Sequence, residues 1–270
     1  MTRYHCHRSQ MDCGQWRRSL AVLLALSICV FFVSHCRADL PATIARLKPS
    51  VVLVGIYGAT DNPRFTFRGT GFAVSSGLEL VTNAHVLPET LPNGPGQQLA
   101  VMTWSGVGQW NLRKVNVVTL DRSRDLALLR MDGPAIPPLK IAEVPAQEGQ
   151  AIAFMGFPIG GVLGYSHVTH RGVISSVAAL ALPPPTSQYL TEKTVAQLRR
   201  GNFQIYQLDA TAYPGNSGGP VFDPETGELV AVINSVMIKG ARETAISNPT
   251  GISYAIPAAH VLTLLQESRP

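Results

Sequence analysis

The segment from 51 to 255 is divided into short apolar runs, three to nine residues long, that are rich in Val, Leu and Ile and bounded by Gly, Pro or Asp. Runs of this length between turn residues are typical of β-strands, because helices need longer periodic segments. The 24 glycines and 20 prolines supply the turns. We predict an all-β chain of two six-stranded antiparallel β-barrels, not βαβ units, with strands at 51–56, 71–74, 78–82, 99–103, 112–120, 126–131, 151–156, 168–176, 205–210, 220–222, 229–235 and 252–255.

A proline-rich connector at 133–138 separates the sixth run from the seventh and predicts a boundary between two halves. We therefore place the first barrel at about 50–132 and the second at about 139–256 of one domain, 39–270.

Two short helices are expected at the ends of this domain. The first covers 39–48 and has apolar residues on one face, and Pro49 ends it. The second covers about 257–266, and we expect Val261, Leu262 and Leu265 to face inward.

Residues 1–38 have the composition of a secretory leader. Arg17 and Arg18 precede an apolar run at 20–33, which is shorter than the roughly 18–20 residues of a membrane span. Small residues follow at Cys36 and Ala38. We predict a signal peptide cleaved after Ala38 and an exported protein, periplasmic or secreted. The alternative is an uncleaved anchor that holds the protein at the membrane outside the cytoplasm, with the leader as its membrane contact.

The charge and the cysteines of the chain also belong mainly to this leader. The full sequence has a net charge of +5, but 39–270 carries 17 Lys and Arg against 16 Asp and Glu, so we expect no nucleic-acid partner. All four cysteines lie within 1–38, which excludes a disulfide, a thiol nucleophile or a cysteine zinc site in 39–270. His167 and His170 would point to opposite faces of a strand, so we predict no metal and no cofactor.

Three polar motifs interrupt the apolar pattern, and they contain His85, Asp125 and Ser217. Taken alone, each has an ordinary structural explanation: a buried histidine, a capping aspartate and a glycine turn. Together they occur in the order His, Asp, Ser, which is one of the known orders of Ser-His-Asp hydrolases. The α/β-hydrolase order begins with the serine, so the order argues against an esterase of that class.

The chemistry of acyl transfer explains these residue types. A serine hydroxyl is a weak nucleophile that needs a neutral imidazole to take its proton, and the imidazole needs a buried carboxylate to fix its tautomer. Glycines beside Ser217 let backbone N–H groups face a developing oxyanion. Asp121 is the alternative carboxylate, but Asp125 is the one followed at once by an apolar strand that would bury it.

At these motifs the sequence resembles the trypsin-like serine peptidases, and most closely their HtrA (Deg) branch. The resemblance covers about 40–266 and is carried by Thr82-Asn-Ala-His85, Asp125-Leu-Ala-Leu-Leu, Gly215-Asn-Ser-Gly-Gly, Gly69-Thr-Gly-Phe72, 156–160, 168–175 and 251–257. It implies a chymotrypsin-like double barrel with the site in the cleft between the barrels.

The resemblance also implies roles for individual residues. Ser217 would be the nucleophile, His85 the general base and acid, and Asp125 the residue that orients His85. The N–H groups of Gly215 and Ser217 would form the oxyanion hole. The implied reaction is hydrolysis of peptide bonds through an acyl-enzyme, with polypeptides as substrates.

For the primary specificity pocket, the resemblance places the floor six residues before the nucleophile, at Thr211, with Ala212 and Ser235 beside it. These residues carry no charge, and an unpaired buried charge is costly, so we expect a small or medium aliphatic residue before the scissile bond. Asp209 is the alternative pocket acid, which would favour Lys or Arg instead.

The sequence departs from the related proteins at three points. Asn216 stands where the digestive branch has an aspartate, and an amide cannot pair with a newly freed N-terminus. We expect a protease domain without the PDZ domain usual in HtrA proteins. The connector 180–204 has no counterpart that we can name.

We therefore expect an exported serine endopeptidase, with a role in protein quality control as the further interpretation and a homo-oligomer left open. The alternative is a catalytically silent peptide-binding protein of the same fold.

Overall fold

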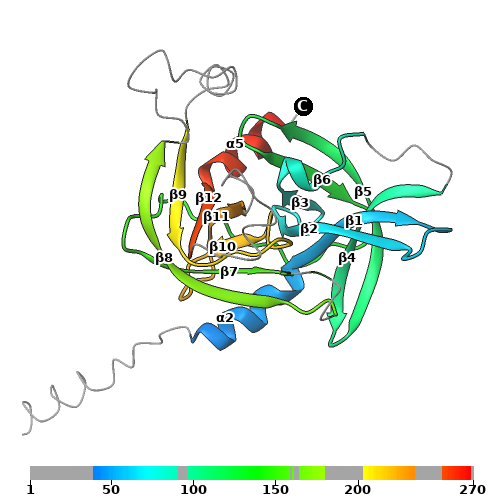
Figure 1. The fold of residues 1–270 in the computed structure, drawn as a ribbon, viewed down its shortest axis with the longest axis horizontal. Coiled ribbons are helices and arrows are strands. Elements are labelled where there is room, and N and C mark those ends of the chain that lie inside the picture. Colours follow the sequence, from blue (N-terminus) through cyan, green and yellow to red (C-terminus); the bar gives the residue numbers. More distant parts are fainter. Residues whose placement is uncertain are drawn as a thin grey trace, which may run out of the picture. The chain divides into compact units, whose positions relative to one another are not determined.

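The computed structural model describes residues 39–90, 96–158, 160, 164–179, 203–234 and 251–268 (Figure 1). The chain divides into two units, Met1–Arg37 and Ala38–Pro270, and every described residue belongs to the second. The predicted leader, most of the connector 180–204 and Ser235 therefore lie outside the described residues. Within the described ranges, no helix is long and apolar enough to cross a membrane.

Six antiparallel strands close the first barrel in the order β1-β2-β3-β6-β5-β4. Figure 1 shows them from blue to green. Their bounds are β1 (Val51–Gly58), β2 (Phe65–Val74), β3 (Glu79–Thr82), β4 (Gln97–Gly106), β5 (Gln109–Asp121) and β6 (Leu126–Met131).

Six more antiparallel strands close the second barrel in the order β10-β11-β12-β9-β8-β7. They are β7 (Ala151–Gly156), β8 (Val168–Ala179), β9 (Gln204–Asp209), β10 (Pro220–Phe222), β11 (Leu229–Asn234) and β12 (Ile252–Pro257). The predicted all-β fold of two six-stranded antiparallel barrels is confirmed. Each predicted strand has a counterpart, and the main difference in bounds is β2, which begins at Phe65 instead of 71.

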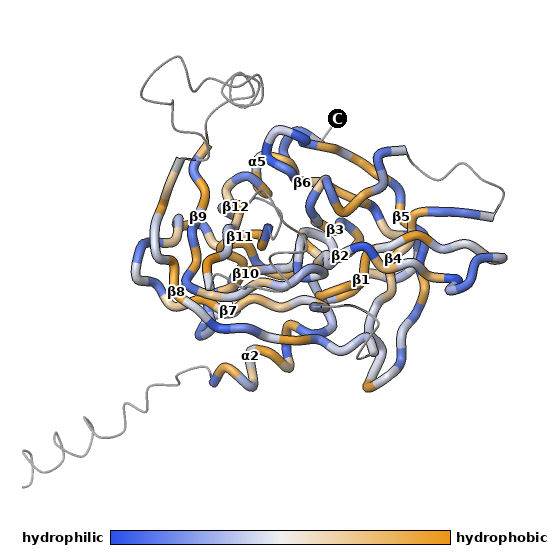
Figure 2. Tube along the Cα trace, viewed as in Figure 1, coloured by the Kyte–Doolittle hydropathy of each residue, from blue (hydrophilic) through white to orange (hydrophobic). Residues whose placement is uncertain are grey.

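The continuously apolar strands are those that contribute to two cores at once. In β1, Val52 and Val54 belong to the core inside the first barrel, whereas Val51 and Leu53 pack in a cluster shared by both barrels. In β7, Ile152 and Phe154 likewise fill the second barrel, and their neighbours join the shared cluster. Alternate side chains of a strand point to opposite faces, so a strand buried on both faces must be apolar at every position. Figure 2 shows these strands as nearly continuous hydrophobic stretches.

Two helices flank the barrels, α2 (Leu40–Leu47) and α5 (Ala259–Glu267), and their apolar faces pack on the shared cluster. A 3₁₀ turn, η1 (Lys48–Ser50), links α2 to β1. The predicted inward face of the last helix is wrong at Leu262, which is 38% exposed, whereas Leu264 is buried with Val261. Positions three and four residues apart share a helix face, so Val261 pairs with Leu264 and Leu265, and the adjacent Leu262 is rotated away.

Candidate active site

His85 and Asp125 are in direct contact. His85 lies in a 3₁₀ turn, η2 (Ala84–Val86), which Asn83 links to the end of β3. Its Nδ1 is 2.6 Å from Oδ2 of Asp125, and its backbone N–H donates to Oδ1 of the same carboxylate at 2.8 Å. Both oxygens of Asp125 are therefore engaged by His85, which fixes the orientation of the imidazole ring.

The turn between β5 and β6 presents Asp125 to His85. Asp125 has a φ of +57°, a left-handed conformation that aspartate tolerates better than most residues. Its carbonyl oxygen accepts from the N–H of Ala84 at 3.1 Å and from Nδ2 of Asn83 at 3.0 Å. Backbone and side chain together hold the residue against the segment that carries His85.

Asp121, the alternative carboxylate, has a structural role in this turn. Its Oδ1 accepts from the N–H groups of Ser123 and Arg124 at 2.9 and 3.0 Å, and its Oδ2 pairs with Nη1 of Arg124 at 2.7 Å. Burial favours a higher pKa for Asp121, but hydrogen bonds from Ser123 and Arg124 and the charge of Arg124 hold the pKa below its usual value. Asp121 thus shapes the turn that presents Asp125.

Asn234, at the end of β11, contributes a contact that sequence reasoning missed. Its Nδ2 donates to Oδ2 of Asp125 at 2.7 Å, and the residue is 1% exposed. A polar residue that ends an otherwise apolar strand, 229–233, was the available signal. Asn234 belongs to the second barrel and Asp125 to the first, so this bond joins the two barrels at the carboxylate.

Ser217 is held in a tight turn before β10 by its glycine neighbours. Gly215 and Gly218 have φ values of +101° and +85°, which side chains rarely permit. Space excludes a side chain as well, since a Cβ on Gly215 would lie 2.3 Å from the carbonyl oxygen of Phe157. A Cβ on Gly218 would lie 2.3 Å from Oγ1 of Thr82, so the Ser217 turn packs against the segment that leads into His85.

Asn216, the residue before Ser217, is fully buried. Its Nδ2 lies 3.5 Å from Nε2 of His170, whose ring stacks on Phe154 with centroids 4.8 Å apart. Burial lowers the pKa of His170, which favours the neutral ring that can accept this bond. His170 therefore contacts the Ser217 turn from β8.

Of the residues predicted for the specificity pocket, the structure describes Thr211 and Ala212, whereas Ser235 lies outside the described residues. The N–H of Ala212 donates to Oγ of Ser253, which in turn donates to the carbonyl oxygen of Ala210, both at 2.8 Å. Thr211 lies between these two anchored residues. Asp209, the alternative pocket acid, is exposed on β9.

His167 lies in an aromatic environment and has different ring contacts from His170. Its ring stacks on Trp110 with centroids 5.3 Å apart, and its Nε2 lies 3.3 Å from the carbonyl oxygen of Val51. Across the described ranges, no three His, Cys, Asp or Glu side chains form a group that could hold a metal ion.

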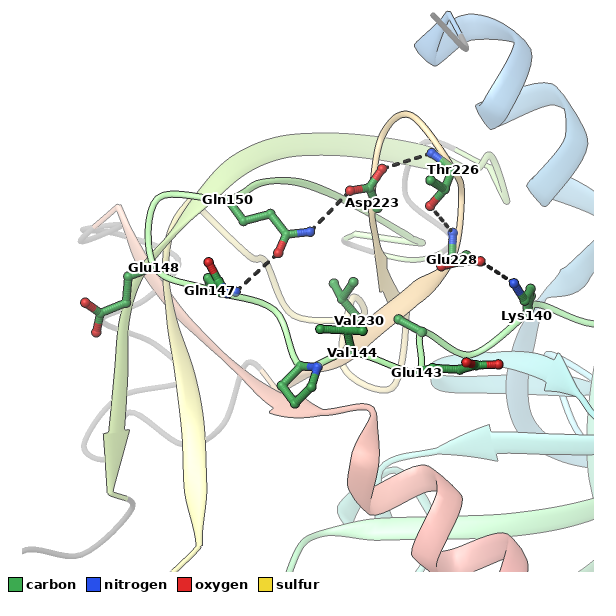
Figure 3. Close-up of a pocket in the computed structure, with 12 residues that line it drawn as sticks. Lys140, Glu143, Val144, Gln147, Glu148, Gln150, Asp223, Thr226, Glu228 and Val230 are labelled. Atoms are coloured by element: carbon green, nitrogen blue, oxygen red, sulfur yellow. Dashed lines mark hydrogen bonds and ion pairs between the residues drawn. The ribbon is translucent and has the colours of Figure 1, made fainter.

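A separate pocket lies on the second barrel and contains none of the predicted site residues (Figure 3). An ion pair between Lys140 and Glu228 and a hydrogen bond from Gln150 to Asp223 cross its wall. Its lining residues are Lys140, Ala142, Glu143, Val144, Pro145, Gln147, Glu148, Gln150, Asp223, Thr226, Glu228 and Val230.

Comparison with known proteins finds a peptidase family model and relatives that are named as serine proteases. A family model described as a trypsin-like peptidase domain matches residues 69–232, a range that contains His85, Asp125 and Ser217. A probable periplasmic DegP-like serine endoprotease of Pseudomonas fluorescens is 26% identical over 190 residues, which are 70% of this chain and 32% of the relative. The mitochondrial serine protease HTRA2 of Drosophila pseudoobscura is 28% identical over 210 residues, which are 77% of this chain and 41% of that protein.

Among solved structures, the active form of the Rv3671c protease of M. tuberculosis is similar. It shares 25% identity with a TM-score of 0.57, over 83% of this chain and 82% of that one. The chain spans about a third of the length of the DegP-like relative.

Proposed function

Because the chain belongs to the trypsin-like peptidase domain family, we propose that it is a serine endopeptidase that uses Ser217, His85 and Asp125. The predicted resemblance to this family is confirmed. The observation that carries the proposal is the 2.6 Å contact between Nδ1 of His85 and Oδ2 of Asp125. In this arrangement Nδ1 holds the proton, and the other ring nitrogen, Nε2, is the base.

The proposed reaction has two halves. Nε2 of His85 takes the hydroxyl proton of Ser217 as Oγ bonds to the substrate carbonyl carbon. The imidazolium, stabilised by Asp125, then gives this proton to the departing amine nitrogen, and an acyl-enzyme forms. Water attacks the ester carbonyl with His85 again as base, and the proton returns to Oγ as the acid product leaves.

The oxyanion of both tetrahedral intermediates would be bound by the N–H groups of Gly215 and Ser217. Within the described residues, the N–H of Gly215 donates to no protein acceptor. The peptide unit that contains the Ser217 N–H is fixed by a 2.9 Å bond from Gly219 to the Asn216 carbonyl. Donors fixed in advance stabilise the developing charge without reorganising during the reaction.

The relatives support a location and a substrate class for this activity. The DegP-like relative is named as a periplasmic endoprotease. We propose that this chain likewise cleaves polypeptides outside the cytoplasm after export by residues 1–38, in the quality control of exported proteins. We also propose that the protein associates with further copies of itself.

The direct test replaces Ser217 with Ala and measures cleavage of a proteome-derived peptide mixture. Loss of the nucleophile lowers turnover by about 10⁶-fold while the fold is retained. Ser175→Ala, at an exposed serine of β8, is the matched control and keeps full activity. An active, folded Ser217→Ala protein would contradict the proposal, and an inactive wild-type protein would favour the silent peptide-binding alternative.

A further inference from the structure

Thr70 belongs to the first barrel, but its hydrogen bonds reach the turn that carries Ser217. The residue lies in β2 and has no exposed surface. Its Oγ1 donates to the carbonyl oxygen of Gly215 at 2.7 Å, and its backbone N–H donates to the carbonyl oxygen of Ser217 at 2.9 Å. One residue therefore holds the backbone on both sides of Asn216.

The same hydroxyl also accepts a hydrogen bond. The N–H of Phe157 donates to Oγ1 of Thr70 at 3.2 Å, and the carbonyl oxygen of Thr70 accepts from Oγ1 of Thr82 at 2.7 Å. Thr70 thus connects three segments: the approach to His85, the segment after β7, and the Ser217 turn. A hydroxyl group can donate and accept at once, which neither an aliphatic side chain nor a carbonyl can do.

These bonds fix the peptide unit next to the proposed oxyanion donor. The carbonyl of the Gly215–Asn216 peptide is held by Thr70, and its N–H donates to the carbonyl oxygen of Tyr213 at 3.0 Å. A glycine has little conformational preference of its own, so its neighbours must set the direction in which its N–H points. Both ends of the following peptide plane are anchored, which restricts the rotation of Gly215.

We propose that Thr70 is a positioning residue for the oxyanion hole: its hydroxyl holds the Gly215 carbonyl and thereby sets the direction of the Gly215 N–H. The inference rests on the proposed function. Thr70 does not touch the substrate and acts through the turn. Oxyanion donors stabilise charge that develops in the transition state, so losing their alignment lowers kcat more than it changes KM. A residue that only joined the barrels would change stability and leave kcat alone.

The test rests on a pair of variants, Thr70→Ser and Thr70→Cys, which differ from each other in one atom. Thr70→Ser keeps the hydroxyl, and Thr70→Cys replaces its oxygen with sulfur, a weak donor and acceptor. Both remove the methyl group that packs near Gly219, so they lose the same packing. Thr70→Val keeps the shape and removes both hydrogen bonds. Thr103→Val is the control, since Thr103 is a buried threonine of the same barrel whose hydroxyl bonds to Asn111 at 3.4 Å.

We expect Thr70→Cys and Thr70→Val to lower kcat for a chromogenic peptide about 10²-fold with KM almost unchanged. Thr70→Ser retains most of the kcat, and Thr103→Val matches the wild type. Unfolding midpoints confirm that the proteins compared are folded, and the serine and cysteine pair decides the question if the valine variant does not fold. Equal kcat in Thr70→Ser and Thr70→Cys would overturn the inference. A wild-type protein with no hydrolysis would instead contradict the proposed function.

Discussion

Asn234 and Asp125 come from different barrels and meet in a 2.7 Å hydrogen bond, in which Nδ2 of Asn234 donates to Oδ2 of Asp125. The same oxygen lies 2.6 Å from Nδ1 of His85. The position of the imidazole therefore depends on the second barrel as well as on the first. A carboxylate that must hold a charged imidazolium benefits from a fixed donor on its other side.

Replacing Asn234 with Leu tests this dependence. The change removes the donor at similar size, so the carboxylate of Asp125 loses one of its fixed contacts. We expect kcat to fall about 10- to 100-fold through the altered position of the imidazole. Asn116→Leu, at an exposed position of β5, is the matched control. Unchanged steady-state kinetics in a folded Asn234→Leu protein would show that the bond does not support the site.

His167 makes the fold sensitive to acid. Burial is the main cause that lowers the pKa of His167 to about 4, although the hydrogen bond to the carbonyl of Val51 opposes part of this effect. The unfolded chain binds the proton near pH 6.5. The contribution of His167 to stability is therefore fully present above pH 6.5, and about 3 kcal/mol of it is lost as the pH falls from about 6.5 to 4.

The variant His167→Phe removes this titration and keeps a ring beside Trp110 and Phe157. Urea unfolding at a series of pH values should show a flatter acid limb for the variant than for the wild type. The remaining slope comes in part from His170 and His260, whose pKa values burial also lowers. Parallel curves for the two proteins would assign the acid sensitivity to other groups.

Cleavage specificity follows from the uncharged residues proposed for the pocket. Thr211 and Ala212 supply no carboxylate, and the side chain of Asp209 is exposed on β9. We expect a small or medium aliphatic residue just before the scissile bond, because a basic side chain would be buried without a counter-charge. Profiling of cleavage sites in a peptide library measures this preference. Dominant cleavage after Lys or Arg would refute it and implicate Asp209.

Export is tested at the N-terminus of the mature protein. The short apolar run and the small residues at Cys36 and Ala38 predict cleavage after Ala38 and a cysteine-free product that begins at Asp39. Intact-mass measurement of the exported protein decides this. A full-length mass in the membrane fraction would support the anchor instead.

The strands could be predicted from the sequence because the signals that mark them are local. Apolar runs and turn residues mark each strand, and the closure of two barrels follows from their number and spacing. The motifs around His85, Asp125 and Ser217 were singled out because they carry the residue types that acyl transfer needs, and the structure places His85 in contact with Asp125. The last helix was misjudged at Leu262 because Val261 and Leu262 are adjacent in the sequence, and adjacent positions do not share a helix face.

The partners of the supporting residues were not predictable, since they are distant in the sequence. Asn234 and Asp125 are 109 positions apart, and Thr70 and Gly215 are 145 apart. Neither residue type carries chemistry of its own that would single it out. These hydroxyl and amide groups reach the site only because the two barrels pack against each other.

The central claim is that Ser217 is an activated nucleophile, and labelling with a fluorophosphonate tests it most directly. This reagent forms a covalent bond to an activated serine oxygen, and peptide mapping then locates the modified residue. The account predicts one label per folded molecule, on Ser217, with none in the His85→Ala variant, which lacks the base. A folded wild-type protein that stays unlabelled, or that carries the label on another serine, would contradict the account.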